Sequence, residues 1–115
     1  MIEAARCPDG VLADEWIQQL EQSKSRRAKD LLADIAIVFE SFAHRGTLEI
    51  PRELNTLVDG LRELKIQDQR FPFFDLEGSP TNAVRLTHGF KKGTVKTPRP
   101  ELDKARWVRR EDGEL

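Results

Sequence analysis

The apolar residues of the N-terminal third recur every three to four positions, which is the spacing of an amphipathic helix. A first set predicts a helix over residues 12–20 and consists of Leu12, Trp16, Ile17 and Leu20. A second set predicts a longer helix after residue 25 and consists of Leu31, Leu32, Ile35, Val38, Phe39 and Phe42. Ser25 is a suitable N-cap for the second helix, and Gly46 is a suitable terminator. Two such helices with a short connection predict an antiparallel hairpin.

Beyond the hairpin the period changes to two, which predicts strands. Residues 47–55 are expected to form a connector, with a short helical turn over residues 52–57. Strands are expected over residues 61–66, 70–76 and 83–90, and their short links favour an antiparallel meander. Pro72 lies in the central strand and lacks an N–H donor, so we expect the strand to bulge or end there. In the last strand one face carries Val84, Leu86, His88 and Phe90.

The two ends of the chain complete the predicted fold. Residues 1–10 are a weakly patterned candidate for an edge strand. Thr97 and Pro98 suit the N-cap and first residue of a C-terminal helix that ends before Gly113, leaving residues 111–115 as a flexible acidic tail. We therefore predict one α+β domain over the whole chain: an N-terminal helical hairpin packed on a small antiparallel sheet of three to four strands, with a C-terminal helix.

Composition narrows the class of protein. The chain has 115 residues, of which 38% are hydrophobic and 34% charged, a balance typical of a soluble globular domain. Its longest apolar run, residues 35–39, is too short to span a bilayer, and its first residues lack a secretory signal pattern. The single cysteine, Cys7, excludes an intramolecular disulfide and argues against a structural zinc site. We expect a cytoplasmic protein without a membrane segment or a bound metal.

The net charge of −1 conceals an uneven distribution. Residues 82–110 carry nine Lys or Arg against two Asp or Glu, a local charge of +7, whereas residues 1–81 carry −5 and residues 111–115 carry −3. A basic segment of this density is typical of a surface that binds a polyanion, although Lys- and Arg-rich helices also serve solubility. The charge pattern alone leaves both interpretations open.

Residues 86–105 contain a more specific pattern. A strand that ends in HGF (residues 88–90) is followed by the lysine-rich segment KKGTVKTP (residues 91–98) and by a helix that opens with Glu101. This pattern resembles the C-terminal signature of HigB-type toxins, a phage-associated branch of the RelE/ParE toxin superfamily. The predicted helical hairpin also matches this family in position, as do four residues upstream of the signature: Glu63, Leu64, Lys65 and Arg70.

The resemblance implies a RelE-like fold and a toxin of a type II toxin–antitoxin system that cleaves mRNA on the ribosome. In that reaction the ribose 2′-hydroxyl attacks the adjacent phosphate and leaves a cyclic phosphate and a 5′-hydroxyl. The site must therefore accept a proton, stabilise charge on the phosphorane and protonate the leaving oxygen. The family largely uses Lys and Arg side chains and requires no metal or organic cofactor. Its implied partners are the ribosome, mRNA and a helix-turn-helix antitoxin similar to HigA, which binds the toxin in a hetero-oligomer.

Three lysines and one arginine are the candidate catalytic residues. Lys92 and Lys96 occupy matching positions in the basic loop, where they are expected to clamp a phosphate; the alternative is that they are solvated surface lysines. Lys65 matches a family Arg and lies opposite the apolar face of its strand. Arg70 is the candidate for stabilising the transition state, because a guanidinium contacts phosphate bidentately. Its alternative role is a salt bridge to a neighbouring carboxylate such as Glu63 or Asp75.

His88 is the candidate general acid or base, because the intrinsic pKa of histidine lies near neutrality. Its predicted place on the apolar face of its strand equally fits a structural histidine at the edge of the core. Further RNA contacts are expected from other basic residues of the C-terminal third: Lys91, Arg99, Arg85 and Arg106.

Two departures from the family pattern bear on activity. The chain contains no tyrosine, and the position that matches a family tyrosine is approximately Leu102. Gly93 stands where the lysine-rich segment usually has a basic residue. Two alternative functions therefore stay open: a catalytically degenerate toxin-like protein that only binds its antitoxin, and a gyrase-directed toxin of the sister branch.

Overall fold

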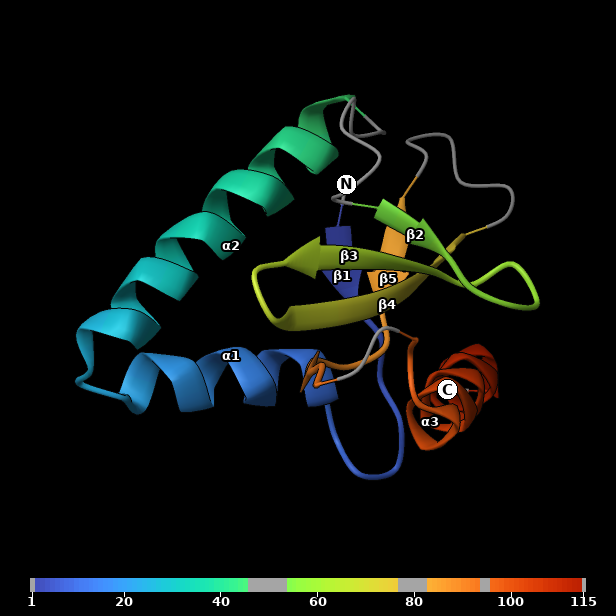
Figure 1. The fold of residues 1–115 in the computed structure, drawn as a ribbon. Helices are drawn as coiled ribbons and strands as arrows, with labels where there is room; N and C mark the ends of the chain where they lie inside the picture. The colour runs from blue at the N-terminus through green and yellow to red at the C-terminus, as the bar shows by residue number, and fades with distance from the viewer. Residues whose placement is uncertain (1, 46–53, 77–82, 94–95, 115) are drawn as a thin grey trace.

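The computed structural model describes residues 2–45, 54–76, 83–93 and 96–114, which form helices and strands of the α+β class expected from the sequence (Figure 1). The helices are α1 (Leu12–Gln22), α2 (Arg26–Arg45) and α3 (Arg99–Glu114). The strands are β1 (Ile2–Ala4), β2 (Leu54–Thr56), β3 (Arg62–Ile66), β4 (Gln69–Asp75), β5 (Val84–Leu86) and β6 (Phe90–Lys91).

The strands form one mixed sheet in the order β1-β5-β4-β3-β2, and β6 also pairs with β4. The antiparallel meander through β3, β4 and β5 is confirmed. The expected sheet of three to four antiparallel strands was wrong, because six strands are described and β1 pairs with β5 in parallel. β1 supplies the edge strand expected within residues 1–10. β2 replaces the helical turn expected over residues 52–57, and the connector up to residue 53 lies outside the described residues.

α1 and α2 form the expected hairpin, and α2 packs on one face of the sheet. Ser25 caps α2 as predicted, since its Oγ accepts a hydrogen bond from the backbone N of Ala28 at 3.1 Å. Gly46, the expected terminator, lies outside the described residues. The main core between the hairpin and the sheet contains ten buried residues: Ala13, Leu31, Ile35, Phe42, Leu64, Ile66, Phe71, Phe73, Val84 and Leu86.

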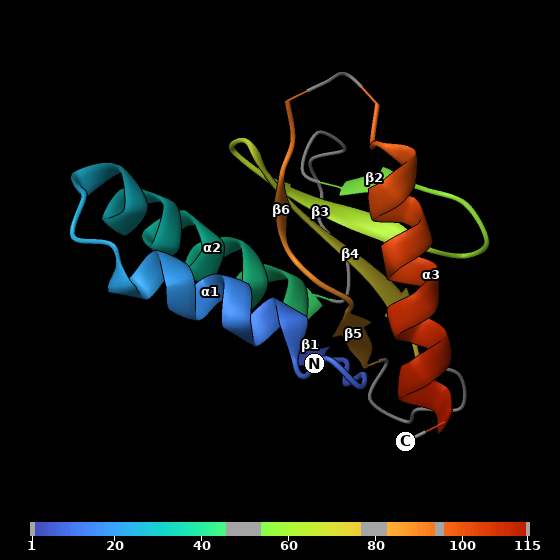
Figure 2. The ribbon, with the colours of Figure 1, turned by 90° about the horizontal axis from the view of Figure 1, so that it is seen from below.

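α3 covers part of the opposite face of the sheet, as Figure 2 shows from below. Successive residues of β4 point to opposite faces, so Phe73 packs toward α2 and Phe74 packs toward α3. The second core is smaller and consists of Ala5, Cys7, Leu61, Phe74, Ala105 and Val108. Two helical layers therefore enclose the sheet unequally.

α3 begins and ends later than the sequence predicts. It starts at Arg99, one residue after Pro98, and continues to Glu114. The flexible tail expected over residues 111–115 was wrong for residues 111–114, which form the last turn of α3. Asp112 is buried there, and it accepts hydrogen bonds from Arg85 Nη1 at 2.6 Å and from the backbone N of Arg6 at 3.0 Å. These long-range partners account for the extra helical turn.

Pro72 does not interrupt its own strand, β4. The interruption lies beside it, in the neighbouring segment that forms β5 and β6. The pairing of β4 with β3 keeps one register through Pro72. Toward β5 and β6 the register shifts by one residue, so the extra residue lies in residues 87–89, beside Pro72. The carbonyl oxygen of Pro72 accepts a hydrogen bond from Thr87 N at 2.8 Å, but its nitrogen has no hydrogen to donate. The single strand expected over residues 83–90 is therefore two strands, β5 and β6.

The extra residue also reverses the face of His88. Its side chain was expected beside Val84 and Leu86, which pack in the main core under α2. Instead, its Nε2 lies 3.0 Å from Glu101 Oε2 in the first turn of α3, on the other side of the sheet. The expected place of His88 on the apolar face was therefore wrong.

Candidate nucleic-acid interface

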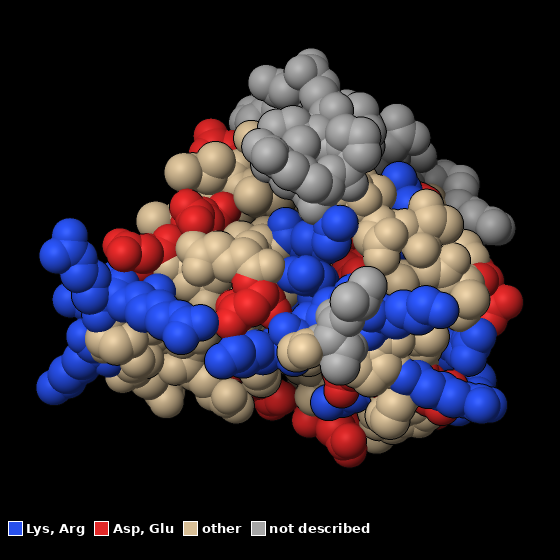
Figure 3. Space-filling model, in the orientation of Figure 1, with Lys and Arg blue, Asp and Glu red and all other residues tan. Residues whose placement is uncertain are grey.

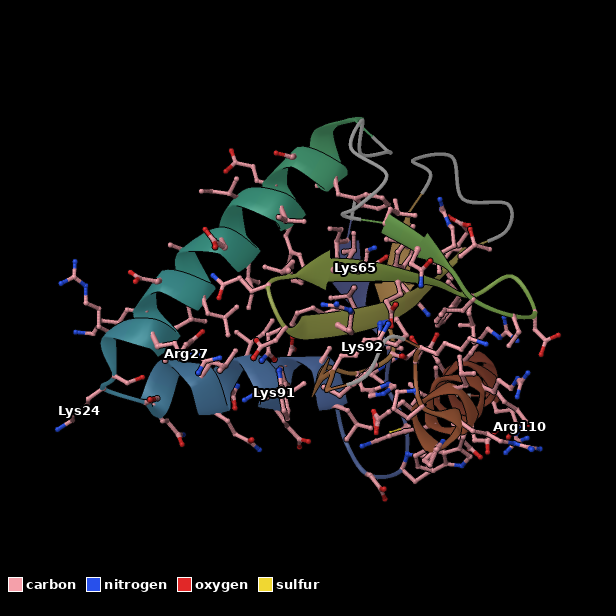
Figure 4. All side chains as sticks on the ribbon, viewed as in Figure 1. Lys24, Arg27, Lys65, Lys91, Lys92 and Arg110 are labelled. Atoms are coloured by element: carbon pink, nitrogen blue, oxygen red, sulfur yellow. The ribbon has the colours of Figure 1, made fainter. Side chains whose placement is uncertain are left out.

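Three of the predicted site residues project from one face of the sheet, which we call the cationic face: Lys65, Arg70 and Lys92. Lys65 of β3 pairs with Arg70 of β4, and Arg70 pairs with Phe90 of β6. Lys92 follows Phe90 by two positions and continues the pairing, since its backbone N donates to Asp68 O at 2.8 Å. Paired and alternate residues share a face of a sheet. Lys65 and Lys92 accordingly lie in front of β3 and β4 in Figure 4, where basic atoms gather in Figure 3.

Arg70 is held by the turn between β3 and β4. Its Nη1 donates to the carbonyl oxygens of Gln67 at 2.7 Å and Gln69 at 2.8 Å. Its Nε is buried and has no hydrogen-bond partner among the described residues. Like charges placed directly opposite each other weaken a sheet, and Arg70 faces Lys65 across the strands. This part of the sheet is therefore arranged at some cost in stability, as binding sites often are.

The two carboxylates suggested as salt-bridge partners of Arg70, those of Glu63 and Asp75, contact other residues. Glu63, which is fully buried, accepts hydrogen bonds from Thr97 Oγ1 at 2.8 Å and from Asn55 Nδ2 at 3.3 Å. Asp75 pairs with Arg62 Nη2 at 2.9 Å. Neither Glu63 nor Asp75 is therefore a salt-bridge partner of Arg70. Thr97 was expected to cap α3, but its hydroxyl instead ties the end of the basic loop to the sheet.

His88 is a structural residue rather than a solvent-facing acid or base. Its side chain is 1% exposed, with Nδ1 2.9 Å from Thr87 Oγ1 and Nε2 3.0 Å from Glu101 Oε2. Burial lowers the pKa of His88 below the usual 6.5, although the Glu101 carboxylate acts in the opposite direction and Lys104 adds to the decrease. A neutral imidazole that donates from Nε2 satisfies the Glu101 carboxylate, and the Thr87 hydroxyl shares its single proton between His88 Nδ1 and the carbonyl oxygen of Pro72, 3.2 Å away. The structure thus supports the structural alternative.

Lys91 lies on the other side of the sheet edge. It pairs beside Gln69 rather than Arg70, and its Nζ lies 3.7 Å from Asp68 Oδ2. Arg27 of α2 contacts the same oxygen at 3.0 Å. Burial alone raises the pKa of Asp68, but the hydrogen bond from Gln69 and the charges of Lys91 and Arg27 together hold that pKa below its usual value. Lys91 is exposed and is separated from Lys65 and Arg70 by the strand it belongs to.

The remaining predicted residues lie in α3 or close to its two ends. Lys96 is exposed and adjoins Thr97, and Arg99 is exposed at the start of the helix. Arg85 pairs with Asp112 near the helix end, and this hydrogen bond raises the pKa of Arg85. Arg106 pairs with two carboxylates, those of Asp59 and Asp103. Because α3 rises about 1.5 Å per residue, Arg85 lies roughly 20 Å along the helix from Arg99. The structure does not bring Arg85 or Arg106 to the cationic face.

The sequence pattern missed three residues beside the cationic face: Asp34, Ile37 and Gln67. They line a pocket of about 450 Å³ between α2 and the β3–β4 turn, together with Lys65 and Arg70. Gln67 Nε2 donates to Asp34 Oδ2 at 2.6 Å. The one available signal was Ile37, an apolar residue outside the buried stripe of its helix, which is 62% exposed.

Comparison with known proteins adds no family assignment. No model of a protein family matches the chain, and no curated protein shows significant sequence similarity to it. Within the described residues, no helix is both long and apolar enough to cross a membrane. The same part of the chain holds no group of three or more His, Cys, Asp or Glu side chains suited to binding a metal ion. Function is therefore inferred from the site itself and from the sequence pattern around it.

Proposed function

We propose that this protein is a HigB-like toxin of the RelE superfamily, a ribosome-dependent endoribonuclease that binds mRNA on the cationic face. The observation that carries the proposal is the convergence of Lys65, Arg70 and Lys92 on one face of the sheet, with no carboxylate partner for any of the three among the described residues. Unpaired cations of this kind favour a polyanionic ligand. The lysine-rich segment that resembles the family signature borders the same face.

In this proposal the cationic face stabilises the negative charge that develops on the phosphate during cleavage. Attack of the 2′-oxygen forms a new P–O bond, and departure of the 5′-oxygen breaks the old one, through a phosphorane that carries additional negative charge. Arg70 offers a fixed positive charge and its Nη2 donors, since Nη1 is held by two carbonyl oxygens, and the two lysines supply further positive charge. His88 lies on the same side of the sheet but is buried, with both ring nitrogens hydrogen-bonded, so we assign neither of the two proton transfers to its imidazole.

The RelE-like arrangement and the partners belong to the same proposal. The helical hairpin, central sheet and C-terminal helix follow the order that the family resemblance implies. A HigA-like helix-turn-helix antitoxin is the proposed partner in a toxin–antitoxin hetero-oligomer, and the ribosome with its mRNA is the proposed target in the cytoplasm. These assignments rest on the sequence resemblance and on the cationic face.

A second candidate is a toxin-like protein that binds RNA or its antitoxin without cleaving. Two features favour this second candidate: His88 is buried with both ring nitrogens hydrogen-bonded, and the chain has no tyrosine. Each feature removes a proton carrier that members of the resembled family use. The two candidates share the cationic face and differ only in whether transcripts are cut.

Induction in bacteria, followed by mapping of transcript 5′ ends, tests the proposal. Cleavage predicts growth arrest with new ends inside translated codons, both lost in Lys65→Gln/Arg70→Gln/Lys92→Gln. The matched control is Lys24→Gln/Arg26→Gln/Arg110→Gln, which removes three exposed cations elsewhere and should leave arrest and cleavage intact. Arrest without new ends supports the binding-only candidate or a gyrase poison. A folded wild-type protein that causes no arrest contradicts the toxin assignment.

A further inference from the structure

The pocket beside the cationic face combines an apolar wall with a polar edge. Its apolar residues are Ile37 and Val38 of α2 and Ile66 of β3, and its polar residues are Asp34 and Gln67. Lys65 and Arg70 stand at its rim on the sheet side. The volume of about 450 Å³ lies within the range of small-ligand pockets. Ile37, which is 62% exposed, offers an apolar surface for a flat ring.

Gln67 is kept in an unfavourable backbone conformation at this pocket. It has a φ of 54°, in the left-handed region, and it is the first of the two residues in the turn between β3 and β4. Asp68, the second, is not among the residues with positive φ. Glycine is the residue preferred where only the first turn position has positive φ. Gln67 therefore does not serve the stability of the turn.

What Gln67 does provide is two oriented contacts. Its side-chain Nε2 donates to Asp34 Oδ2 at 2.6 Å, and its carbonyl oxygen accepts from Arg70 Nη1 at 2.7 Å. One residue thus fixes both the carboxylate at the polar edge and the guanidinium at the rim. Strained backbone that orients neighbouring polar groups is a common feature of binding sites.

The polar edge presents hydrogen-bond acceptors. Asp34 Oδ1 has no partner among the described residues, and Oδ2 keeps a second lone pair beside Gln67. Guanine offers two adjacent donors, N1–H and the N2 amino group, which match the two oxygens of a carboxylate. Uracil places carbonyl oxygens on both sides of its single N–H, and these oxygens are repelled by a carboxylate. A base bound here would have its ring against Ile37 and Val38, since bases held in protein pockets lie between aromatic or apolar side chains.

We infer that the pocket binds a nucleobase of the RNA, with guanine preferred, while Lys65 and Arg70 hold the adjacent phosphate. This inference rests on the proposed function and adds a base-specific subsite to it. Asp34 and Gln67 are the specificity-determining residues. The acidic edge disfavours an acidic peptide of a partner protein, although the rim cations alone would attract one.

Titration of the full chain with nucleoside 3′,5′-bisphosphates tests the inference. Each probe has a phosphate on the 3′ side and on the 5′ side of the nucleoside. One of the two can therefore reach Lys65 and Arg70 whichever way the base is bound. We expect the guanosine probe to bind about tenfold more tightly than the uridine probe, the effect of one bidentate base contact. The inosine probe, which lacks only the N2 amino group, should fall between them.

Three variants and one control separate base recognition from phosphate binding. Asp34→Asn should reduce the guanosine-to-uridine ratio to near one, whereas Asp30→Asn, which removes an exposed carboxylate from the same helix, should leave it unchanged. Gln67→Gly relieves the backbone strain, so it should fold at least as well as the wild type and still lose most of the preference. Lys65→Gln should weaken all three probes alike.

The outcomes distinguish this inference from the proposed function. Equal affinities for the three probes, weakened together in Lys65→Gln, would overturn the base subsite and leave the RNA-binding face standing. An unchanged preference in Asp34→Asn would overturn the assignment of Asp34. Binding of no probe, with no growth arrest on induction, would overturn both. Displacement of the probes by an acidic peptide without any base preference would instead identify the pocket as a protein-docking surface.

Discussion

The two faces of the β3–β4 hairpin are built from the same twelve residues of strand and have opposite characters. The face toward α2 carries Leu64, Ile66, Phe71 and Phe73, none of them more than 3% exposed. The other face carries Glu63, Lys65, Arg70 and Pro72 at the paired positions. Because alternate residues of a strand point to opposite sides, one short segment serves both the core and the candidate site.

The difference shows where stability and chemistry reside in this molecule. Under α2 these four residues belong to the main core, and Phe39 meets Phe71 edge to face at 5.3 Å. On the other face α3 covers only the end near Phe74, and the cationic face lies beyond it. Apolar substitutions should therefore act on folding, and substitutions of the cations on binding.

The largest effect is expected on the face of the β3–β4 hairpin that packs against α2. Phe71→Ala removes a fully buried ring and its contact with Phe39, and we expect the free energy of unfolding to fall by about 3–5 kcal/mol. Urea unfolding followed by circular dichroism measures the change. Lys92→Gln on the opposite side is the matched control and should change stability by less than about 0.5 kcal/mol. Equal losses in the two variants would contradict the division between the faces.

A smaller effect is expected at Gly89, which lies between β5 and β6 and packs closely against Trp16 of α1 and Phe71 of β4. A Cβ at Gly89 would lie 2.5 Å from Trp16 Cδ1 and 2.8 Å from Phe71 Cε1, so Gly89→Ala should cost about 1–3 kcal/mol through forced repacking. Gly93→Ala adds a carbon that no heavy atom of the described residues approaches within 4 Å, apart from its chain neighbours, and it serves as the control in the same unfolding experiment. If both alanines were tolerated equally, the close packing at Gly89 would be disproved.

Local patterns in the sequence predicted much of this architecture. Helical spacing identified α1 and α2, and the Ser25 cap marked where α2 begins. Period-two alternation identified β3, and the strands expected over residues 70–76 and 83–90 contain all but the first residue of β4 and the whole of β5. These features depend on neighbours within a few positions, so the chain determines them locally.

The failures share a different cause, which is contact between distant segments. The parallel pairing of β1 with β5 joins residues about eighty positions apart, and no local pattern encodes it. One extra residue in residues 87–89 reversed the face of His88, because alternation was assumed to continue unbroken. The last turn of α3 depends on Arg85 and Asp112, and the pocket depends on Asp34 meeting Gln67. Only the folded chain brings these pairs together.

A pH titration sharpens the comparison on the face that α3 covers. Burial lowers the pKa of His88 in the folded protein, so the unfolded chain takes up a proton first as the pH falls below about 6.5. The contribution of His88 to stability is therefore complete above that pH and is lost progressively below it. Urea unfolding at several pH values should show a decline that is shallower in His88→Gln. An identical decline in the two proteins would mean that the imidazole is not held neutral by burial.

The smallest expected effect concerns the cationic face and has the opposite sign. Lys65 and Arg70 face each other without a carboxylate partner among the described residues, so Lys65→Gln should raise the free energy of unfolding by about 0.2–1 kcal/mol at low salt. The gain should shrink in 1 M salt, where the Debye length is about 3 Å. Lys24→Gln, which neutralises an exposed lysine before α2, controls for general loss of charge. A variant that is more stable and binds RNA more weakly would show that the two like charges are retained for the ligand, whereas a salt-independent loss of stability would place Lys65 among the residues that hold the fold together.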